Sequence, residues 1–398
     1  MLPRFLLVLI LAFAAVPAHA DVHVSGEQIL VDGKPFPIRG AGGEQRLDLL
    51  KQLGATVVRT YGDPPDAVLE EAQKLGLKVI VGFWLEHPRR GFDYADPAQA
   101  GAQLERLAAF VKRYRDHPAL LMWGVGNEVE AELDDDSRVW PGIGQAAALV
   151  RRLDPEHPVM AVLAEAGGGK VAKLMRAAPA VDVLGINSYG DALPNLPQRV
   201  RAQGWKGPIV VTEMGAIGQW QAQRKPWGAS IEPSSTEKAA LLRGYLQALA
   251  PATAGQVLFY WGQKQEVTPT WHSLLLPDGS WTETAEVMAG AWGGKTPGGN
   301  SAPRIGRFDM EAGRAVLEVT DPDGDAMAVQ WSVMAESTDL RKAGDLETVP
   351  ATFGQALAAS DLAGARVGAL PAGHYRLFVT VRDGRGAVAT GNLPFMVN

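Results

Sequence analysis

Short apolar runs alternate with longer segments of helical periodicity over residues 36–294. Most of the runs are rich in Val, Ile and Leu without clean polar alternation, as expected for strands buried on both faces of a parallel sheet. The runs are 37–43, 56–61, 78–84, 120–127, 158–164, 183–189, 209–215 and 256–262. The helical segments that follow them are 44–53, 65–75, 97–115, 142–153, 169–177, 196–203, 236–249 and 282–292. Eight strand-helix units over about 260 residues predict an α/β fold, a (β/α)8 TIM barrel, with an open doubly wound sheet as the alternative.

Two segments of different character flank the predicted barrel. Before it, residues 22–37 carry Asp32-Gly33 between apolar residues, which predicts a hairpin that plugs the bottom of the barrel, or else a frayed terminus. After it, residues 293–303 contain four Gly and two Pro, a composition typical of a linker. We therefore expect the barrel domain over residues 21–293 and the linker over residues 294–303.

The last part of the chain has the pattern of a small β domain. Turn signals occur at Asp323-Gly324 and Asp383-Gly384. Strand-like runs occur at 315–319, 328–333 and 375–381. This pattern predicts an immunoglobulin-like β-sandwich over residues 304–398, and bracing of the barrel is its default role.

The first twenty residues have the features of an export signal. Arg4 precedes an apolar run over residues 5–16, and Ala18-His19-Ala20 places small residues at the cleavage spacing. Cleavage after Ala20 would leave a periplasmic or secreted protein. An uncleaved anchor is the weaker alternative, because the run is shorter than the ~18 residues that cross a bilayer, and no later segment is long enough.

Composition excludes several classes of ligand. The net charge of −6 comes from 38 basic and 44 acidic residues without a basic stripe, which argues against nucleic acid and favours a neutral ligand. The chain has no cysteine, so it has no disulfide and no thiolate metal site. Asp321, Asp323 and Asp325 resemble calcium ligands, but the glycine and glutamate of a helix-loop-helix site do not follow, so a structural turn is favoured. His87 and His272 have no partners at ligand spacing, and we expect no metal and no cofactor.

Two predicted strands end in a glutamate. The fourth run ends in Asn127-Glu128, and the seventh ends with Glu213 in Thr-Glu-Met-Gly. Active sites of such barrels lie at the carboxyl ends of the strands, so the two side chains can face each other across the barrel mouth. Either residue alone could cap a helix or form a surface ion pair. Together they fit the hydrolysis of a glycosidic bond, which needs one carboxylic acid to protonate the leaving oxygen and one carboxylate to attack or to activate water.

With these motifs the sequence resembles the glycoside hydrolases of clan A over residues 36–294. In that clan the acid/base glutamate ends strand four in an Asn-Glu pair and the nucleophile ends strand seven. The resemblance implies that Glu128 is the acid/base, that Glu213 is the nucleophile, and that the anomeric configuration is retained. It also implies sugar-binding or supporting roles for further residues at strand ends, namely Arg59, Asn127, Tyr189 and Trp261.

Several other residues are candidates for contacts with substrate. Aromatic rings stack on pyranose faces, so tryptophans near strand ends are candidate platforms, and Trp84 and Trp261 are the best of them. The others are Trp140, Trp220, Trp227 and Trp271. Four spare acids, Glu86, Glu130, Glu232 and Glu266, are expected on the solvated surface, although Glu130 lies close enough to Glu128 to touch substrate. The long segments 216–235 and 263–281 are expected to wall the cleft.

The motifs Val58-Arg-Thr-Tyr61 and Gly126-Asn-Glu-Val129 resemble families that act on β-1,3-glucans, including glucanosyltransferases, and add Tyr61 to the substrate-binding candidates. A barrel followed by a sandwich also resembles arrangements in families 2 and 5. The usual family 2 chain carries sandwich domains before its barrel, which counts here against a full family 2 β-galactosidase. We expect a β-glucan as substrate. Open alternatives are a transglycosylase with the same residues, a noncatalytic polysaccharide-binding barrel, and a barrel enzyme for phosphorylated substrates. The last is the weakest, because the sequence lacks a Gly-rich phosphate loop after strands seven and eight.

Overall fold

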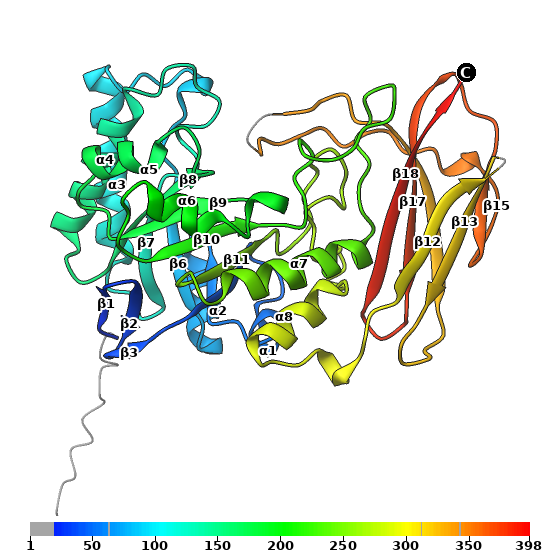
Figure 1. Ribbon diagram of the computed structural model, residues 1–398, viewed down its shortest axis with the longest axis horizontal. Helices are drawn as coiled ribbons and strands as arrows, with labels where there is room; N and C mark the ends of the chain where they lie inside the picture. The colour runs from blue at the N-terminus through cyan, green and yellow to red at the C-terminus, as the bar shows by residue number, and fades with distance from the viewer. Residues whose placement is uncertain (1–19, 63, 312, 342–343) are drawn as a thin grey trace, which may run out of the picture.

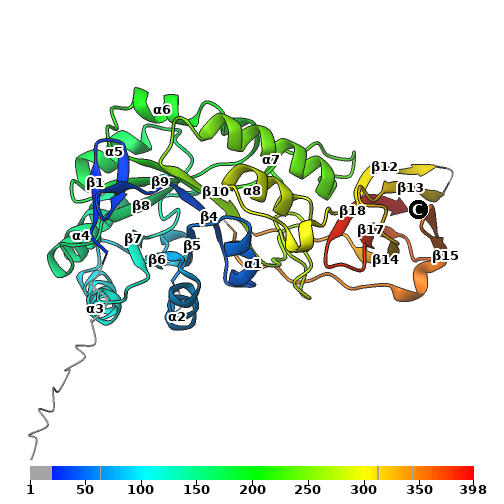
Figure 2. The ribbon, with the colours of Figure 1, turned by 90° about the horizontal axis from the view of Figure 1, so that it is seen from below.

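The computed structural model describes residues 20–62, 64–311, 313–341 and 344–398. A barrel and a β-sandwich lie side by side, with helices α7 (Ser235–Leu249) and α8 (Thr284–Trp292) between them (Figures 1 and 2). The predicted export signal falls almost entirely outside the described residues. Within them, none of the helices combines the length and apolar character needed to cross a membrane.

Eight parallel strands form the closed barrel, in the order β10-β11-β4-β5-β6-β7-β8-β9. Their bounds are β4 Ile38–Gly42, β5 Val57–Arg59, β6 Lys78–Phe83, β7 Leu120–Val125, β8 Val159–Ala164, β9 Val183–Asn187, β10 Ile209–Met214 and β11 Gly255–Phe259. Every residue of β7, β9 and β10 is buried, as the continuous apolar runs predicted. The predicted (β/α)8 barrel is confirmed, and the open sheet is excluded.

Helices cover the outside of the barrel (Figure 2). Besides α7 and α8 they are α1 Leu47–Gln52, α2 Asp66–Leu75, α3 Pro97–Tyr114, α4 Val139–Leu153, α5 Lys170–Ala177 and α6 Leu196–Ala202. Short 3-10 turns are η1 Pro88–Arg90, η2 Gly190–Ala192, η3 Pro297–Gly299 and η4 Gly354–Ala356. Helix α7 begins at a capping box in which Ser234 and Glu237 satisfy each other's backbone N–H groups, which fixes where the long segment after β10 ends.

The segment before the barrel forms a three-stranded sheet of β1 (Val22–Ser25), β2 (Gln28–Val31) and β3 (Lys34–Pro35). Asp32 and Gly33 both have positive φ, 50° and 72°, as a two-residue hairpin turn of the primed type requires. Val22 and Ile29 pack against barrel-lining residues such as Val57 and Val210. The sheet therefore covers the end of the barrel opposite the strands' carboxyl ends.

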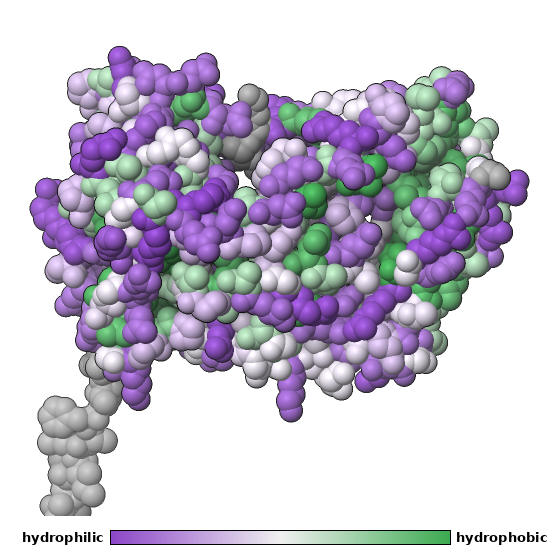
Figure 3. All heavy atoms as spheres, in the orientation of Figure 1, coloured by the Kyte–Doolittle hydropathy of each residue, from purple (hydrophilic) through white to green (hydrophobic). Residues whose placement is uncertain are grey.

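The C-terminal part is a sandwich of a four-stranded sheet, β12-β13-β16-β15, and a three-stranded sheet, β14-β17-β18. The strands are β12 Arg304–Glu311, β13 Arg314–Thr320, β14 Ala328–Ala335, β15 Leu357–Asp361, β16 Gly364–Val367, β17 Gly373–Arg382 and β18 Val388–Val397. In chain order these sheets correspond to strands ABED and CFG, the arrangement of immunoglobulin constant domains. On the face drawn in Figure 3, hydrophobic residues gather over this part, whereas the barrel is mostly hydrophilic.

Buried polar contacts join the sandwich to the barrel. The buried Glu232 carboxylate accepts hydrogen bonds from Lys238 of α7 at 2.5 Å and from Asn392 of β18 at 2.6 Å. Arg376 of β17 donates to the carbonyl oxygen of Ser230 at 3.0 Å. Glu232 is thus a structural residue of the interface, and the prediction of a solvated surface acid at this position was wrong.

The aspartates considered as calcium ligands do not all converge. Asp321, Asp325 and Asp383 hold oxygens within 4.8 Å of one another, whereas Asp323 accepts a hydrogen bond from the Ser301 backbone at 2.6 Å. Asp325 is paired with Arg385 at 3.1 Å. Asp321 accepts from two backbone N–H groups of its own turn, which is what the structural-turn interpretation predicted.

Candidate active site

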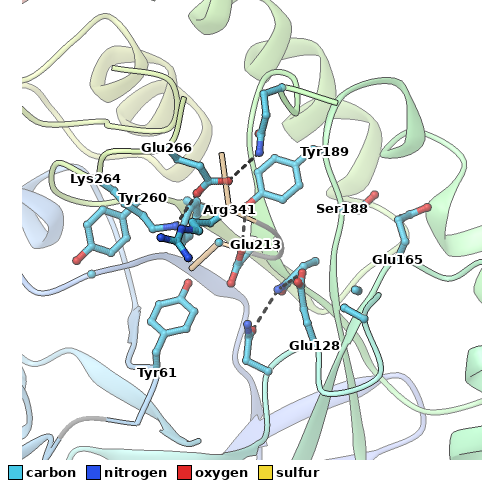
Figure 4. Close-up of a pocket in the computed structure, with 18 of the residues that line it drawn as sticks. Tyr61, Glu128, Glu165, Ser188, Tyr189, Glu213, Tyr260, Lys264, Glu266 and Arg341 are labelled. Carbon is cyan, nitrogen blue, oxygen red and sulfur yellow. Dashed lines mark hydrogen bonds and ion pairs between the residues drawn. The ribbon is translucent and has the colours of Figure 1, made fainter. Parts of the chain in front are cut away.

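A cavity of about 970 Å³ opens at the carboxyl ends of the barrel strands. Glu128, the third residue after the buried strand β7, and Glu213, in β10, both line it (Figure 4). The cavity lies at the upper end of the size range of ligand pockets and is large enough for more than one sugar ring.

Glu213 is held in place by two hydrogen-bond donors. Its side chain is 9% exposed and accepts from Arg59 of β5 at 3.2 Å and from the Tyr189 hydroxyl at 2.8 Å. A Cβ on the neighbouring Gly215 would lie 2.9 Å from the Tyr189 ring, so a glycine there lets the ring reach the carboxylate. A guanidinium and a phenol are the surroundings of an anionic carboxylate, because both stabilise negative charge.

Glu128 has different surroundings. Its backbone adopts a left-handed conformation with φ of 53°, which a non-glycine residue adopts only at a cost and which is frequent at functional sites. Burial, and then the nearby charge of Glu213, raise the pKa of Glu128 to about 8. Near neutral pH the Glu128 carboxyl therefore carries a proton that it can donate.

Asn187, the last residue of β9, links Glu128 to the residues that hold Glu213. Its amide nitrogen donates to Glu128 at 2.8 Å and to the Asn127 side-chain oxygen at 3.1 Å. Its own oxygen accepts from the Thr212 hydroxyl at 2.8 Å. Arg59 donates to the same Asn127 oxygen at 2.6 Å and also holds Glu213, so one polar network fixes both glutamates. The sequence interpretation missed Asn187, although a polar residue that ends an apolar run at this rim is itself a signal for the site.

The structure brings most of the predicted site residues together. Besides the two glutamates, the cavity is lined by Arg59, Tyr61, Trp84, Asn127 and Tyr189. The Arg59 guanidinium lies over the Tyr61 ring at 4.3 Å.

Trp261 does not belong to this set, and its prediction as a sugar platform was wrong. It is fully buried in the barrel core and is not among the described residues that line the cavity. Strand β11 ends at Phe259, earlier than the sequence indicated, and Phe259 and Tyr260 face the cavity instead.

Two of the tryptophans line the cavity, Trp84 and Trp220, and Trp220 is 58% exposed. Trp140 and Trp271 are buried in hydrophobic clusters, and Trp227 stacks on His374 of the sandwich. Trp220 follows β10 and is a more suitable sugar platform than the buried tryptophans.

The spare acids differ from the expectation of a solvated surface. Glu86 is half exposed and pairs with Arg106 at 3.5 Å, as expected. Glu130 is buried, pairs with Lys170 at 3.1 Å and is not among the described residues that line the cavity. Glu266 is buried at the cavity wall.

Glu266 forms a charged cluster with its neighbours. Although burial acts in the opposite direction, His272 and Lys264 hold the pKa of Glu266 far below its usual range. The Lys264 ammonium lies 2.5 Å from Glu266, and the Gln219 amide donates to Glu266 at 3.1 Å. The segments 216–235 and 263–281 thus both contribute to the cavity wall, as predicted.

The basic residues of the cavity are each paired with an acid of the protein. The described lining contains seven glutamates and four basic residues, Arg59, Lys170, Lys264 and Arg341. Their partners are Glu213, Glu130, Glu266 and Asp339, respectively. The excess of acids makes the cavity unfavourable for a polyanion.

The closed barrel and a pair of strand-end glutamates joined through Asn and Arg define a glycoside hydrolase barrel of clan A. Within that clan, a family model described as "Glycosyl hydrolases family 2, TIM barrel domain" matches residues 22–213, a stretch that contains both glutamates. The barrel of this chain is therefore similar to the barrels of family 2.

Relatives agree with this assignment. Human β-glucuronidase is 28% identical over 227 residues, which cover 49% of this chain and 33% of the human protein. The β-galactosidase BoGH2A of Bacteroides ovatus is 25% identical over 203 residues, covering 43% of this chain and 23% of that protein. The solved β-D-glucuronidase of Dictyoglomus thermophilum superposes with a TM-score of 0.54 and 21% identity, over 70% of this chain and 54% of that one. The chain therefore spans only about a quarter to a half of the length of these relatives.

Proposed function

We propose that this protein is a retaining β-glycosidase in which Glu213 is the nucleophile and Glu128 is the acid/base. The observation that carries the proposal is the single network through Asn187 and Arg59, which joins two cavity carboxyls in contrasting surroundings. One carboxyl is set to hold a proton, and the other is stabilised as an anion. Pairs of this kind perform acid and nucleophilic roles in glycoside hydrolysis.

In the first step the Glu213 carboxylate attacks the anomeric carbon, and the bond to the leaving oxygen breaks as Glu128 donates its proton to that oxygen. In the second step the Glu128 carboxylate takes a proton from water, whose oxygen attacks the anomeric carbon and releases Glu213. Two displacements at one carbon retain its configuration. A sugar hydroxyl in place of water would give transglycosylation with the same residues, which is the alternative function.

For the substrate we propose a neutral β-linked glycan, with a β-glucan as the first candidate. The relatives named above act on β-glucuronides or β-galactosides. The carboxylate of a uronic acid needs a cation in its binding site. Each basic residue in the described cavity lining is already paired with an acid of the protein, which favours a neutral sugar over a uronic acid. The volume of about 970 Å³ suits an oligosaccharide.

A substrate panel with active-site variants tests these proposals. Aryl β-glucoside, β-galactoside and β-glucuronide are compared with β-1,3- and β-1,4-linked gluco-oligosaccharides, and the anomer released first is identified by proton NMR. Glu213→Gln and Glu128→Gln should each lower kcat by about 10³-fold or more, because each removes a group needed in the transition state. Glu86→Gln, which alters a half-exposed acid outside the cavity lining, serves as the matched control.

Two outcomes would contradict the proposal. Release of the inverted anomer would exclude the double displacement, and full activity of Glu213→Gln would remove Glu213 from the mechanism. Preference for the glucuronide over the neutral glycosides would overturn the substrate class alone. Analysis of products by mass spectrometry at high oligosaccharide concentration separates the two functions, since only a transglycosylase yields chains longer than its substrate.

We also propose that the protein is exported to the periplasm or the medium, on the strength of the apolar run at residues 5–16. Amino-terminal sequencing of the protein recovered from cell fractions tests this. A mature protein that begins at Asp21 is expected, and an uncut protein in the cytoplasm would contradict it.

A further inference from the structure

A segment of the sandwich domain reaches the cavity of the barrel. The connection between β14 and β15 extends from the sandwich toward the barrel, in orange in Figure 1. Arg341, Gly344, Leu346 and Glu347 of this connection line the same cavity as Glu128 and Glu213. We call these four residues the wall residues.

Contacts on two sides of the barrel mouth hold the wall residues in place. The Glu347 carboxylate accepts from the backbone N–H of Val267, after β11, at 2.6 Å and from that of Arg341 at 3.1 Å. Asp345, between two wall residues, pairs with Arg89 of η1 at 2.9 Å and also with Arg90. Described residues of the connection thus contact both the loop after β11 and the loop after β6.

Two of the wall residues lie on the Lys264 side of the catalytic pair: Arg341 in Figure 4, and Gly344, where an added Cβ would lie 3.1 Å from the Lys264 ammonium. In Figure 4, Arg341, Lys264, Tyr260 and Tyr61 are on one side of Glu213, and Glu128 lies on the other side. An acid/base residue stands next to the leaving oxygen, so the leaving group extends on the Glu128 side. The side with Arg341 and Gly344 therefore accommodates the glycone, the part of the substrate whose anomeric carbon is attacked.

Leu346 is far more exposed than a residue that only braces the two domains against each other would be. It is 87% exposed, the highest value among the exposed large hydrophobic residues in the described part of the chain. The domain interface is already secured elsewhere by Glu232, Asn392 and Arg376. A single exposed leucine is ordinary on an open surface, but this one lines a cavity that also contains Trp84 and Trp220. Sugar rings present apolar C–H faces to such side chains.

We propose that the sandwich domain forms part of the substrate site. Leu346 packs against the apolar face of a sugar unit beyond the one that Glu213 attacks, and Arg341 donates hydrogen bonds to its hydroxyl groups. This inference rests on the proposed glycosidase function. It assigns to the C-terminal domain the selection of substrates by the length of their glycone, in addition to bracing.

The test compares a short and a long substrate in matched variants. The ratio of kcat/KM on a β-linked gluco-oligosaccharide to kcat/KM on the aryl β-monoglycoside is measured for wild type, Leu346→Ala, Arg341→Ala and Val349→Ala. Val349 is 63% exposed in the same connection and is not among the described lining residues, so it controls for loss of an exposed apolar side chain. Leu346→Ala should lower the ratio about tenfold, because most of the free energy of burying one leucine side chain against the sugar is lost. Arg341→Ala should lower it as well, and Val349→Ala should leave it within twofold.

Ratios for both wall variants equal to that of Val349→Ala would overturn the inference, even in an active enzyme. If the wild-type protein hydrolyses none of the glycosides, the proposed function fails instead. Calorimetric binding of gluco-oligosaccharides to wild type and Leu346→Ala then decides the inference by itself. Equal affinities, or no binding to either protein, would refute it, and weaker binding to the variant would support it.

Discussion

Replacement of Asn187 by alanine tests how the polar network controls the pKa of Glu128, the proposed acid/base residue. The Asn187 amide donates to Glu128 at 2.8 Å, and this hydrogen bond lowers the pKa of Glu128 against the larger effect of burial. Its removal should therefore raise the pKa of Glu128 above its value of about 8. A hydrogen bond to a charged group contributes about 1.5–3 kcal/mol, which corresponds to roughly one to two pKa units.

The assay is the pH dependence of kcat/KM, whose alkaline limb reports the proton on the acid/base of the free enzyme. Wild type should lose activity as the pH rises through about 8. In Asn187→Ala this limb should move up by at least about one unit, while the maximal rate falls because Glu128 and Asn127 lose a common partner. Asn195→Ala, at an exposed position before α6, is the control and should match wild type. A limb that stays in place or moves to lower pH in Asn187→Ala would show that this hydrogen bond does not lower the pKa of Glu128.

Three further predictions concern Tyr189 and Glu128 in the cavity and Glu232 at the domain interface. Tyr189→Phe removes a hydrogen bond of 2.8 Å to Glu213 and should lower kcat about 10- to 100-fold in steady-state assays. Its melting temperature should match that of wild type. An unchanged kcat would exclude a role for the hydroxyl. Folded Glu128 keeps its proton up to about pH 8, whereas the unfolded chain loses it near 4.5, so wild-type stability falls as pH rises through this window. The melting temperature of Glu128→Gln should exceed that of wild type at pH 9 by more than at pH 5, and a constant difference in calorimetry would contradict the pKa shift. Glu232→Gln leaves the Lys238 ammonium buried without its counter-charge, so it should lower the free energy of unfolding by about 3–5 kcal/mol in urea titrations. A loss below about 1 kcal/mol would show that the domain interface does not depend on the Glu232 charge.

The barrel was predictable because its strands are continuous apolar runs and its helices follow at regular intervals. Strand β7, for example, is buried along its whole length, so its six residues are apolar or glycine and stand out in the sequence as one continuous run. The sandwich was predicted from three runs only. Its edge strand β15 is largely exposed along Leu357–Asp361, and such a sequence carries little hydrophobic signal.

The carboxyl pair was predictable because strand ends in a parallel barrel all meet at one rim. The fine arrangement was not, because it depends on where each strand ends. A strand that ends at Phe259 turns Tyr260 toward the cavity and Trp261 into the core, and the apolar run through residue 262 gave no sign of this change. Arg341 and Leu346 reach the site from another domain, more than a hundred residues beyond Glu213, and only the tertiary structure brings them there.

The proposed mechanism requires that Glu213 forms a covalent bond to the glycone. It is tested most directly by incubating the protein with a 2-deoxy-2-fluoro-β-glycoside that carries a good leaving group, followed by mass spectrometry of proteolytic peptides. One added glycosyl group is expected, located on Glu213 and absent from Glu213→Gln. A label on another residue, or turnover of the unfluorinated glycoside without any labelled enzyme and with inversion of the anomer, would contradict it.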